Sequence, residues 1–281
     1  TAWISGSSYS RSYTGSQAVV NRSSSEFGGG WWLDGLDKLV VNSSGGLLVQ
    51  GNGDTLWFSS NGAGGYNKAV GDADYSALVK NANNTYTLTA KNGVARNFST
   101  TGLLTSVVDL NGNTTSLTYT DADSDTVVDE LSKITDPFSR DINLSYSSGR
   151  LSSITDFASR STSLAYTSTR LTSATLPDPD GAGSLSSPVV AYAYNGTTYL
   201  LTSQTDPLSH VESFAYGSTS QRLSTITHPD STTTQIVPVQ TIGLASGTGN
   251  TLSKPADAVG VLTDERGKQS KYKTDRFGGI V

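Results

Sequence analysis

The stretch Leu151-Ser152-Ser153-Ile154-Thr155-Asp156, followed after a turn by Leu164 and Tyr166, decides how this chain folds. Leu164 and Tyr166 are two residues apart, which places both side chains on one face of a pleated strand. Leu151 and Ile154 are three apart and would lie on opposite sides of a flat strand. One helical turn among Ser, Thr and β-branched neighbours is too short to be stable alone, so we expect a short strand that leads into a turn.

The same pattern recurs along the chain, with a basic period of about twenty residues. Three further clean copies begin at Leu104, Leu131 and Leu201, and in all four copies the turn Asp and the closing Tyr are ten residues apart. Less regular copies are marked by Leu171 with Tyr192 and Tyr194, by Leu223 with His228, and by Asp264 with Tyr272. The chain is therefore built on a repeat.

Each copy is predicted to be a β-hairpin. Turn formers separate its two halves, as in Asp136-Pro137-Phe138-Ser139-Arg140, where Pro fixes φ and the Asp carboxylate can accept bonds from the backbone. A single hairpin is marginal in water, so neighbouring copies must pair edge to edge and bury a shared face. We expect an all-β fold in which repeat β-hairpins form a long, antiparallel, curling sheet.

Residues 1–100 differ from the rest of the chain in the pattern of their residues, and residues 101–281 contain the repeats. The first segment combines Gly with Trp31, Trp32 and Trp57, which suggests a β lead-in or a cap for the open end of the array. The end of the chain looks like the start of another copy, so we expect the array to continue beyond Val281.

Composition excludes several classes of protein. The formal net charge is −5 without a basic cluster, which argues against a nucleic-acid partner. No apolar run approaches 18 residues, so we expect no membrane span in this segment. The chain has no Cys, which rules out disulfides and thiolate chemistry, and its 13 Tyr, 7 Phe and 4 Trp argue for an ordered protein.

The repeat resembles the YD repeat of the Rhs protein family. Gly149-Arg150-Leu151-Ser152-Ser153-Ile154-Thr155-Asp156 matches its first half in order, and Tyr119-Thr120-Asp121 matches its closing motif. Gly30-Trp31-Trp32-Leu33-Asp34-Gly35-Leu36 is similar to the lead-in that precedes such arrays, and the stretch from Tyr75 to Asn81 is similar to a later part of it. Tyr146 and Tyr166 lack the following Asp that names the repeat.

The resemblance implies a β-sheet ribbon that spirals into a shell, as in bacterial toxin cocoons and teneurin ectodomains. On this basis we expect a non-enzymatic scaffold, secreted or at the cell surface, that encloses or displays another domain. Its partners would be the rest of a larger Rhs-type chain or identical subunits, with carbohydrate or a cell-surface protein as further candidates. The alternative is a cell-surface adhesin or a self-assembling extracellular fibre subunit whose exposed strand edges pair between molecules.

One acidic loop has the spacing of a metal site. Asp121, Asp123, Asp125 and Asp129 could converge on a hard cation, and Ca²⁺ prefers six to eight such oxygens. The loop departs from a calcium-binding hand, with Thr126 at its sixth position, so a solvated acidic turn is the competing interpretation. No cofactor is required, and calcium is the one candidate.

No catalytic residue is predicted. Asp136, Asp156 and Asp206 recur in step with the repeat and are expected to cap turns rather than act as paired carboxylates. His210 and His228 also fall in turns, and no Gly-x-Ser-x-Gly motif accompanies them. The Tyr columns and the Trp residues could offer a platform for sugars, but core packing is the simpler interpretation.

Overall fold

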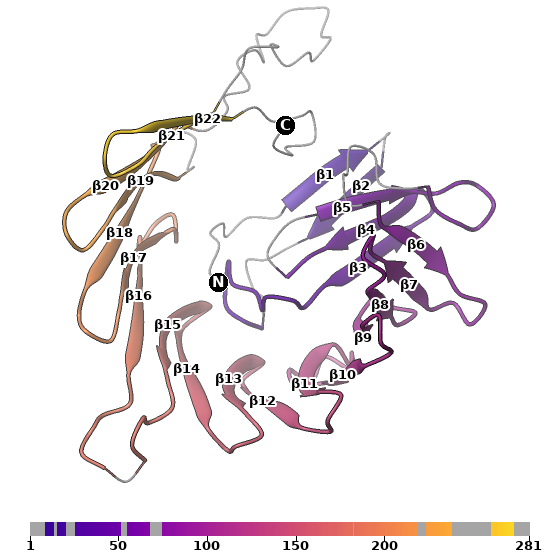
Figure 1. The fold of residues 1–281 in the computed structure, drawn as a ribbon, viewed down its shortest axis with the longest axis horizontal. Coiled ribbons are helices and arrows are strands. Elements are labelled where there is room, and N and C mark those ends of the chain that lie inside the picture. Colours follow the sequence, from indigo (N-terminus) through magenta and orange to yellow (C-terminus); the bar gives the residue numbers. More distant parts are fainter. Residues whose placement is uncertain are drawn as a thin grey trace, which may run out of the picture. The chain divides into compact units, whose positions relative to one another are not determined.

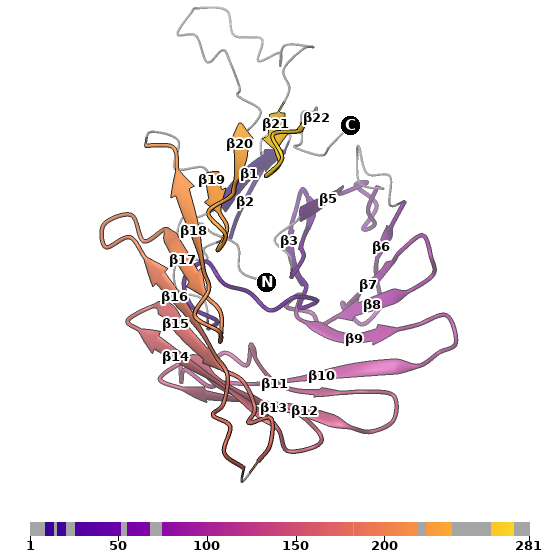
Figure 2. The same ribbon diagram turned by 60° about the vertical axis from the view of Figure 1, so that its left-hand side comes forward.

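The computed structural model describes residues 9–13, 16–20, 26–51, 55–67, 75–181, 183–218, 223–237 and 260–272, with the backbone alone for the first two stretches. Every regular element among these residues is a β-strand (Figure 1; Figure 2). Seventeen of the described strands, β6 to β22, form an antiparallel sheet that is not closed. The predicted all-β class and the long antiparallel sheet are therefore confirmed.

The chain divides into two compact units, Thr1–Val190 and Ala191–Val281. In the first unit, two small antiparallel groups lie outside the large sheet. They are the hairpin of β1 (Tyr9–Tyr13) and β2 (Ser16–Val20), and the sheet of β3 (Lys38–Asn42), β4 (Gly45–Val49) and β5 (Thr55–Ser59).

The first unit also holds the strands of the large sheet from β6 to β15. Each pairs antiparallel with the next one along the chain, so that hairpins follow one another (Figure 2). The strands are β6 (Ala77–Lys80), β7 (Tyr86–Thr89), β8 (Ala95–Phe98), β9 (Leu104–Val108), β10 (Thr114–Thr120), β11 (Glu130–Thr135), β12 (Asp141–Ser147), β13 (Arg150–Thr155), β14 (Ser161–Thr167) and β15 (Arg170–Thr175). The predicted hairpin in each regular copy is confirmed here.

The three-stranded sheet packs against the start of the large sheet. Leu39, Leu48 and Phe58 form one buried cluster with side chains of β6 to β9. The backbone joins the two as well, because the N–H of Leu39 donates to the carbonyl of Gly102 at 2.8 Å. The contributing side chains of the large sheet are Leu78, Tyr86, Leu88, Phe98 and Leu104.

An Asp organises the turn of each regular hairpin. Oδ1 of Asp136 accepts hydrogen bonds from the backbone N–H groups of Phe138 and Arg140, at 2.8 and 2.9 Å. Oδ2 accepts a bond from Nε of Arg140 at 2.6 Å. The turn brings Ser139 into the left-handed region, with φ 61°. Asp156 and Asp206 accept the same pair of backbone bonds in their own turns, so the predicted capping role is confirmed.

A β-bulge explains why the leading Leu and the aliphatic residue three positions later share a face. Between β12 and β13, Ser145 lies opposite Ser153 and Tyr146 lies opposite Leu151, so Ser152 is an extra residue. The extra residue shifts the alternation of side chains by one position. The hydroxyl of Ser152 donates to the carbonyl of Ser145 at 3.0 Å. The equivalent bulge residues of the first unit are Thr105, Ser132 and Thr172.

In the copies that begin at Leu104 and Leu131, the closing Tyr reaches across its own hairpin. The hydroxyl of Tyr119 donates to the carbonyl of Leu104 at 2.7 Å, and the hydroxyl of Tyr146 donates to the carbonyl of Leu131 at 2.8 Å. Donor and acceptor are fifteen residues apart in both cases. Each bond therefore links the last strand of a copy to the first residue of its repeat pattern.

The second unit repeats this construction. Its strands are β16 (Val189–Tyr194), which begins just before the unit boundary, β17 (Leu201–Thr205), β18 (Val211–Tyr216), β19 (Leu223–Thr227), β20 (Thr233–Val237), β21 (Gly260–Thr263) and β22 (Gln269–Tyr272). They pair antiparallel in chain order. The hydroxyl of Tyr216 donates to the carbonyl of Leu201 at 2.8 Å, again over fifteen residues.

Candidate functional site

One face of the repeat strands in the first unit carries the Leu and Tyr columns, and we call it the Leu/Tyr face. Residues 26–36, the lead-in segment, lie against it. Phe27 of this segment is buried in one cluster with Leu131, Leu144 and Leu151 of β11, β12 and β13. Further side chains of the lead-in segment that pack on this cluster are Trp31, Leu33 and Leu36. The Leu/Tyr face therefore holds a stretch of chain that forms no strand of its own.

Backbone hydrogen bonds fix the lead-in segment in place. The N–H of Leu151 donates to the carbonyl of Glu26 at 2.9 Å, and the N–H of Gly29 donates to the carbonyl of Thr169 at 2.7 Å. Both partners belong to the repeats, one at the start of β13 and one in the turn after β14. The segment is thus held by backbone bonds as well as by apolar packing.

Gly28 allows the lead-in segment to approach the repeats closely. Its φ of 95° lies in a region that L side chains rarely adopt, and a Cβ there would lie 3.1 Å from Cε1 of Tyr166 and 3.2 Å from the nitrogen of Leu171. Glycine at position 28 therefore allows the backbone of the lead-in segment to contact the repeats at this point.

Burial changes the ionisation of the first residue of this segment. The pKa of Glu26 is raised, mainly because burial removes its carboxylate from water, although Lys38 opposes the shift. Burial also raises the pKa of Tyr119 and of Tyr146, and the charge of Glu26 adds to both shifts. The Leu/Tyr face thus disfavours negative charge at these groups.

The acidic loop predicted to bind calcium is partly assembled. Asp121, Asp123 and Glu130 each present one carboxylate oxygen, and these oxygens all lie within 4.8 Å of one another. Backbone N–H groups of the loop also bind two of these carboxylates: Asp121 accepts those of Asp125 and Thr126, and Asp123 accepts that of Asp125. The other two predicted ligands lie outside the group: Oδ1 of Asp125 accepts the N–H of Val127 at 2.8 Å, and Asp129 forms an ion pair with Lys38 over 3.6 Å.

Glu130 follows Asp129 at the end of the same acidic stretch and was not among the four predicted ligands. It is the first residue of β11 and only 6% of it is exposed, and its Oε2 accepts the N–H of Ala122 at 2.8 Å. Burial raises the pKa of its carboxyl, and the charges of Asp129 and Asp123 add to the shift. Oxygen donors alone suit a hard cation such as Ca²⁺, so calcium stays a prediction for this loop, and the structure brings together two of its four predicted ligands, Asp121 and Asp123, with Glu130.

The turn carboxylates lie in separate turns. As described for Asp136, each Asp carboxylate accepts bonds from the backbone N–H groups two and four residues ahead. It also contacts the side chain four residues ahead. Those bonds lower the pKa of Asp136, Asp156 and Asp206, with backbone and side-chain donors of Arg140, Arg160 and His210 as the largest causes. Carboxylates held in this way stabilise turns.

The aromatic residues considered as a sugar platform are largely packed inside. Trp57 is buried with Leu47 and Val49 of the three-stranded sheet. Tyr119 and Tyr146 are partly buried in the cluster that holds the lead-in segment. For these three residues the geometry favours core packing.

Comparison with known proteins adds no family: no protein-family model and no curated protein matches the chain. The described part of the chain contains no helix with the length and hydrophobicity that a membrane span needs.

Proposed function

We propose that this chain is a non-enzymatic structural scaffold, a segment of an extracellular β-shell of the Rhs/YD-repeat type that encloses or displays another part of its protein. The observation that carries the proposal is the lead-in segment on the Leu/Tyr face. A sheet that binds an irregular stretch of chain through apolar columns has the chemistry needed to hold other polypeptide. This proposal places the protein at the cell surface or outside the cell.

The construction of the repeats supports a rigid wall. Successive hairpins are joined by cross-strand hydrogen bonds and by a bulge at a fixed position. Within a hairpin, a Tyr hydroxyl reaches back fifteen residues to the start of the copy. In such arrays stability is close to a sum over neighbouring repeats, so a long wall can be made by adding copies.

The exposed hairpin turns favour a second candidate, a self-assembling or adhesive surface protein. Leu110, Phe138 and Phe157 stand at successive turns of the first unit with 73%, 79% and 57% of their surface exposed. The guanidinium of Arg140 lies 4.7 Å from the ring centroid of Phe157. Exposed apolar side chains in a row are typical of surfaces that contact other proteins.

Electron microscopy of the protein purified from its natural source separates the two candidates. The scaffold proposal predicts closed particles that contain internal density. Fibres or sheets of regularly repeating subunits would support the self-assembling alternative. Separate open chains with no enclosed density and no contacts between copies would contradict both.

A further inference from the structure

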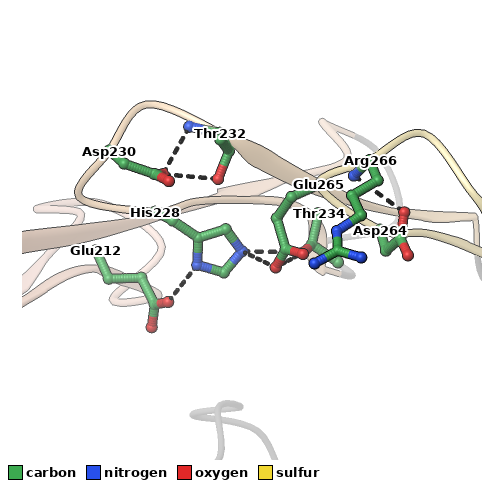
Figure 3. A network of polar contacts seen from close by, with 8 residues as sticks. All are labelled: Glu212, His228, Asp230, Thr232, Thr234, Asp264, Glu265 and Arg266. Carbon is green, nitrogen blue, oxygen red and sulfur yellow. Dashed lines mark hydrogen bonds and ion pairs between the residues drawn. The ribbon is translucent and has the colours of Figure 1, made fainter.

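His228 lies in the second unit at the turn position that Asp136, Asp156 and Asp206 take in other copies. An imidazole is longer than an Asp side chain, so it reaches beyond its own turn. Its partners come from its own hairpin and from the hairpins on either side: Thr234 on β20, Glu212 on β18, and Glu265 in the turn between β21 and β22 (Figure 3). The side chain is 24% exposed.

Glu212 fixes the orientation of the ring. Its Oε1 lies 2.9 Å from Nδ1 of His228, which places the proton of a neutral ring on Nδ1. The lone pair of Nε2 then points away from Glu212 toward Thr234 and Glu265 (Figure 3). A carboxylate that orients a histidine in this way is the usual outer partner of a metal-binding imidazole.

Three atoms that could bind a metal ion lie close together on the other side of the ring. Nε2 of His228 lies 2.9 Å from Oγ1 of Thr234 and 3.2 Å from Oε1 of Glu265, and the two oxygens are 3.4 Å apart. Ligand atoms about 2.0–2.1 Å from one zinc ion are separated by about 2.9–3.4 Å for bond angles between a right angle and the tetrahedral value. The triangle therefore has the size of one face of a zinc coordination sphere.

Charge also favours a cation here. Glu212 and Glu265 face the two nitrogens of the ring, at 2.9 and 3.2 Å. A neutral ring would leave the Oε1 of Glu265 facing the lone pair of Nε2. A divalent ion bound to both atoms removes that repulsion.

A catalytic role fits this arrangement less well. The arrangement has the order of a catalytic triad, with Thr234 in the place of the nucleophile, His228 in that of the base and Glu212 in that of the orienting acid. A general base must keep the nitrogen facing the nucleophile free to accept its proton. Here Glu265 competes for that side of the ring, and its negative charge lies beside the hydroxyl that would have to become an alkoxide.

We propose that Nε2 of His228, Oε1 of Glu265 and Oγ1 of Thr234 bind a divalent first-row transition-metal ion, with zinc as the expected ion and Glu212 orienting the ring. Water completes the tetrahedron. Imidazole and carboxylate are common zinc ligands, and the hydroxyl is the weakest of the three donors. The bound ion ties the hairpin of β19 and β20 to the hairpin of β21 and β22.

Zinc titration of the whole chain by isothermal calorimetry tests the proposal, with His210 as a matched control. The chain has two histidines, and His210 has a single carboxylate partner, Asp206, at 2.9 Å on Nδ1. We expect one zinc ion to bind in the unmodified chain and in His210→Gln, and that binding to disappear in His228→Gln. Glu212→Gln should weaken binding about 10–100-fold, as loss of an outer partner does.

Zinc bound at the acidic loop of the first unit would persist in His228→Gln, so the proposal is tested by the one zinc ion whose binding this substitution removes. Melting curves in chelator show whether the variants fold like the unmodified chain. Equal zinc binding with and without His228 would overturn the proposal, and so would binding that depends on His210. A nitrogen-15 spectrum of metal-treated protein that shows both ring nitrogens of His228 protonated would also overturn it, because a proton would then occupy the place of the metal.

Discussion

The hydroxyl of Tyr146 donates a hydrogen bond to the backbone carbonyl of Leu131 over 2.8 Å. Leu131 is fully buried, so this carbonyl has little access to water. The bond ties the end of one hairpin to its beginning, and Tyr119 and Tyr216 make the equivalent bond in their own copies. The same Tyr-to-Leu bond therefore recurs in three copies of the repeat.

Removing this hydroxyl should weaken the first unit. Tyr146→Phe leaves the Leu131 carbonyl without its donor, so we expect a loss of about 1–3 kcal/mol in the free energy of unfolding. Urea denaturation followed by tryptophan fluorescence measures it. Tyr75→Phe is the control, since 59% of Tyr75 is exposed and its change should be much smaller. Equal effects of the two substitutions would show that the buried bond contributes nothing.

The same tyrosines predict a loss of stability in alkali. Burial raises the pKa of Tyr119 and Tyr146, and that of Tyr216 to about 12, above the unfolded value of about 10. The folded chain therefore holds these protons more tightly, and its stability is complete below about pH 10 and falls as the pH rises further. The urea midpoint should drop between about pH 10 and pH 12, and the drop should be smaller in Tyr146→Phe. A midpoint that stays constant over this range would contradict the prediction.

The hairpin turns contain strain that glycine should relieve. Ser139 has φ 61°, whereas the equivalent position of another copy is Gly112 with φ 82°. We expect Ser139→Gly to raise the stability by about 0.5–1 kcal/mol, because the left-handed conformation costs an L-residue more than glycine loses in chain entropy. Ser163→Gly, in the middle of β14, should instead lower stability by about 0.5–1 kcal/mol. Thermal melting of both variants measures these opposite shifts.

Calcium should stabilise the first unit if the acidic loop binds it. Addition of Ca²⁺ to chelator-treated protein should raise the melting temperature by mass action, and Glu130→Gln should abolish the rise. Asp125→Asn is the control, since the Asp125 carboxylate accepts the N–H of Val127 and lies outside the group of three. A melting temperature that does not change on addition of calcium would contradict the prediction of a calcium site in this loop.

The sequence predicted the parts of the fold that depend on neighbours in the chain. Strands at the Leu/Tyr spacing and turns at the Asp positions are both confirmed. The first half of each copy was harder, because three-residue spacing fits no flat strand. The bulge at Ser152 explains this spacing. The sequence marks the bulge position, because Ser or Thr follows the leading Leu in the copies that begin at Leu104, Leu131, Leu151, Leu171, Leu201 and Leu223.

The contacts that the sequence did not predict join residues far apart in the chain. The lead-in segment meets the repeats more than a hundred residues later, as in the contact of Glu26 with Leu151. Spacing within a loop could not show that Glu130 turns back toward Asp121 and Asp123. His228 meets Glu265 only because the intervening hairpins pair in order. Local pattern has no information about such pairings until the register of the sheet is known.

Photo-cross-linking from Phe27 tests most directly whether the Leu/Tyr face holds chain. With benzoyl-phenylalanine in place of Phe27, mass spectrometry after irradiation should find cross-links to peptides that contain Leu131, Leu144 or Leu151, which form one buried cluster with Phe27. Cross-links confined to other peptides, or only to solvent, would contradict the account, because the face would then not be holding the segment on which the scaffold proposal depends.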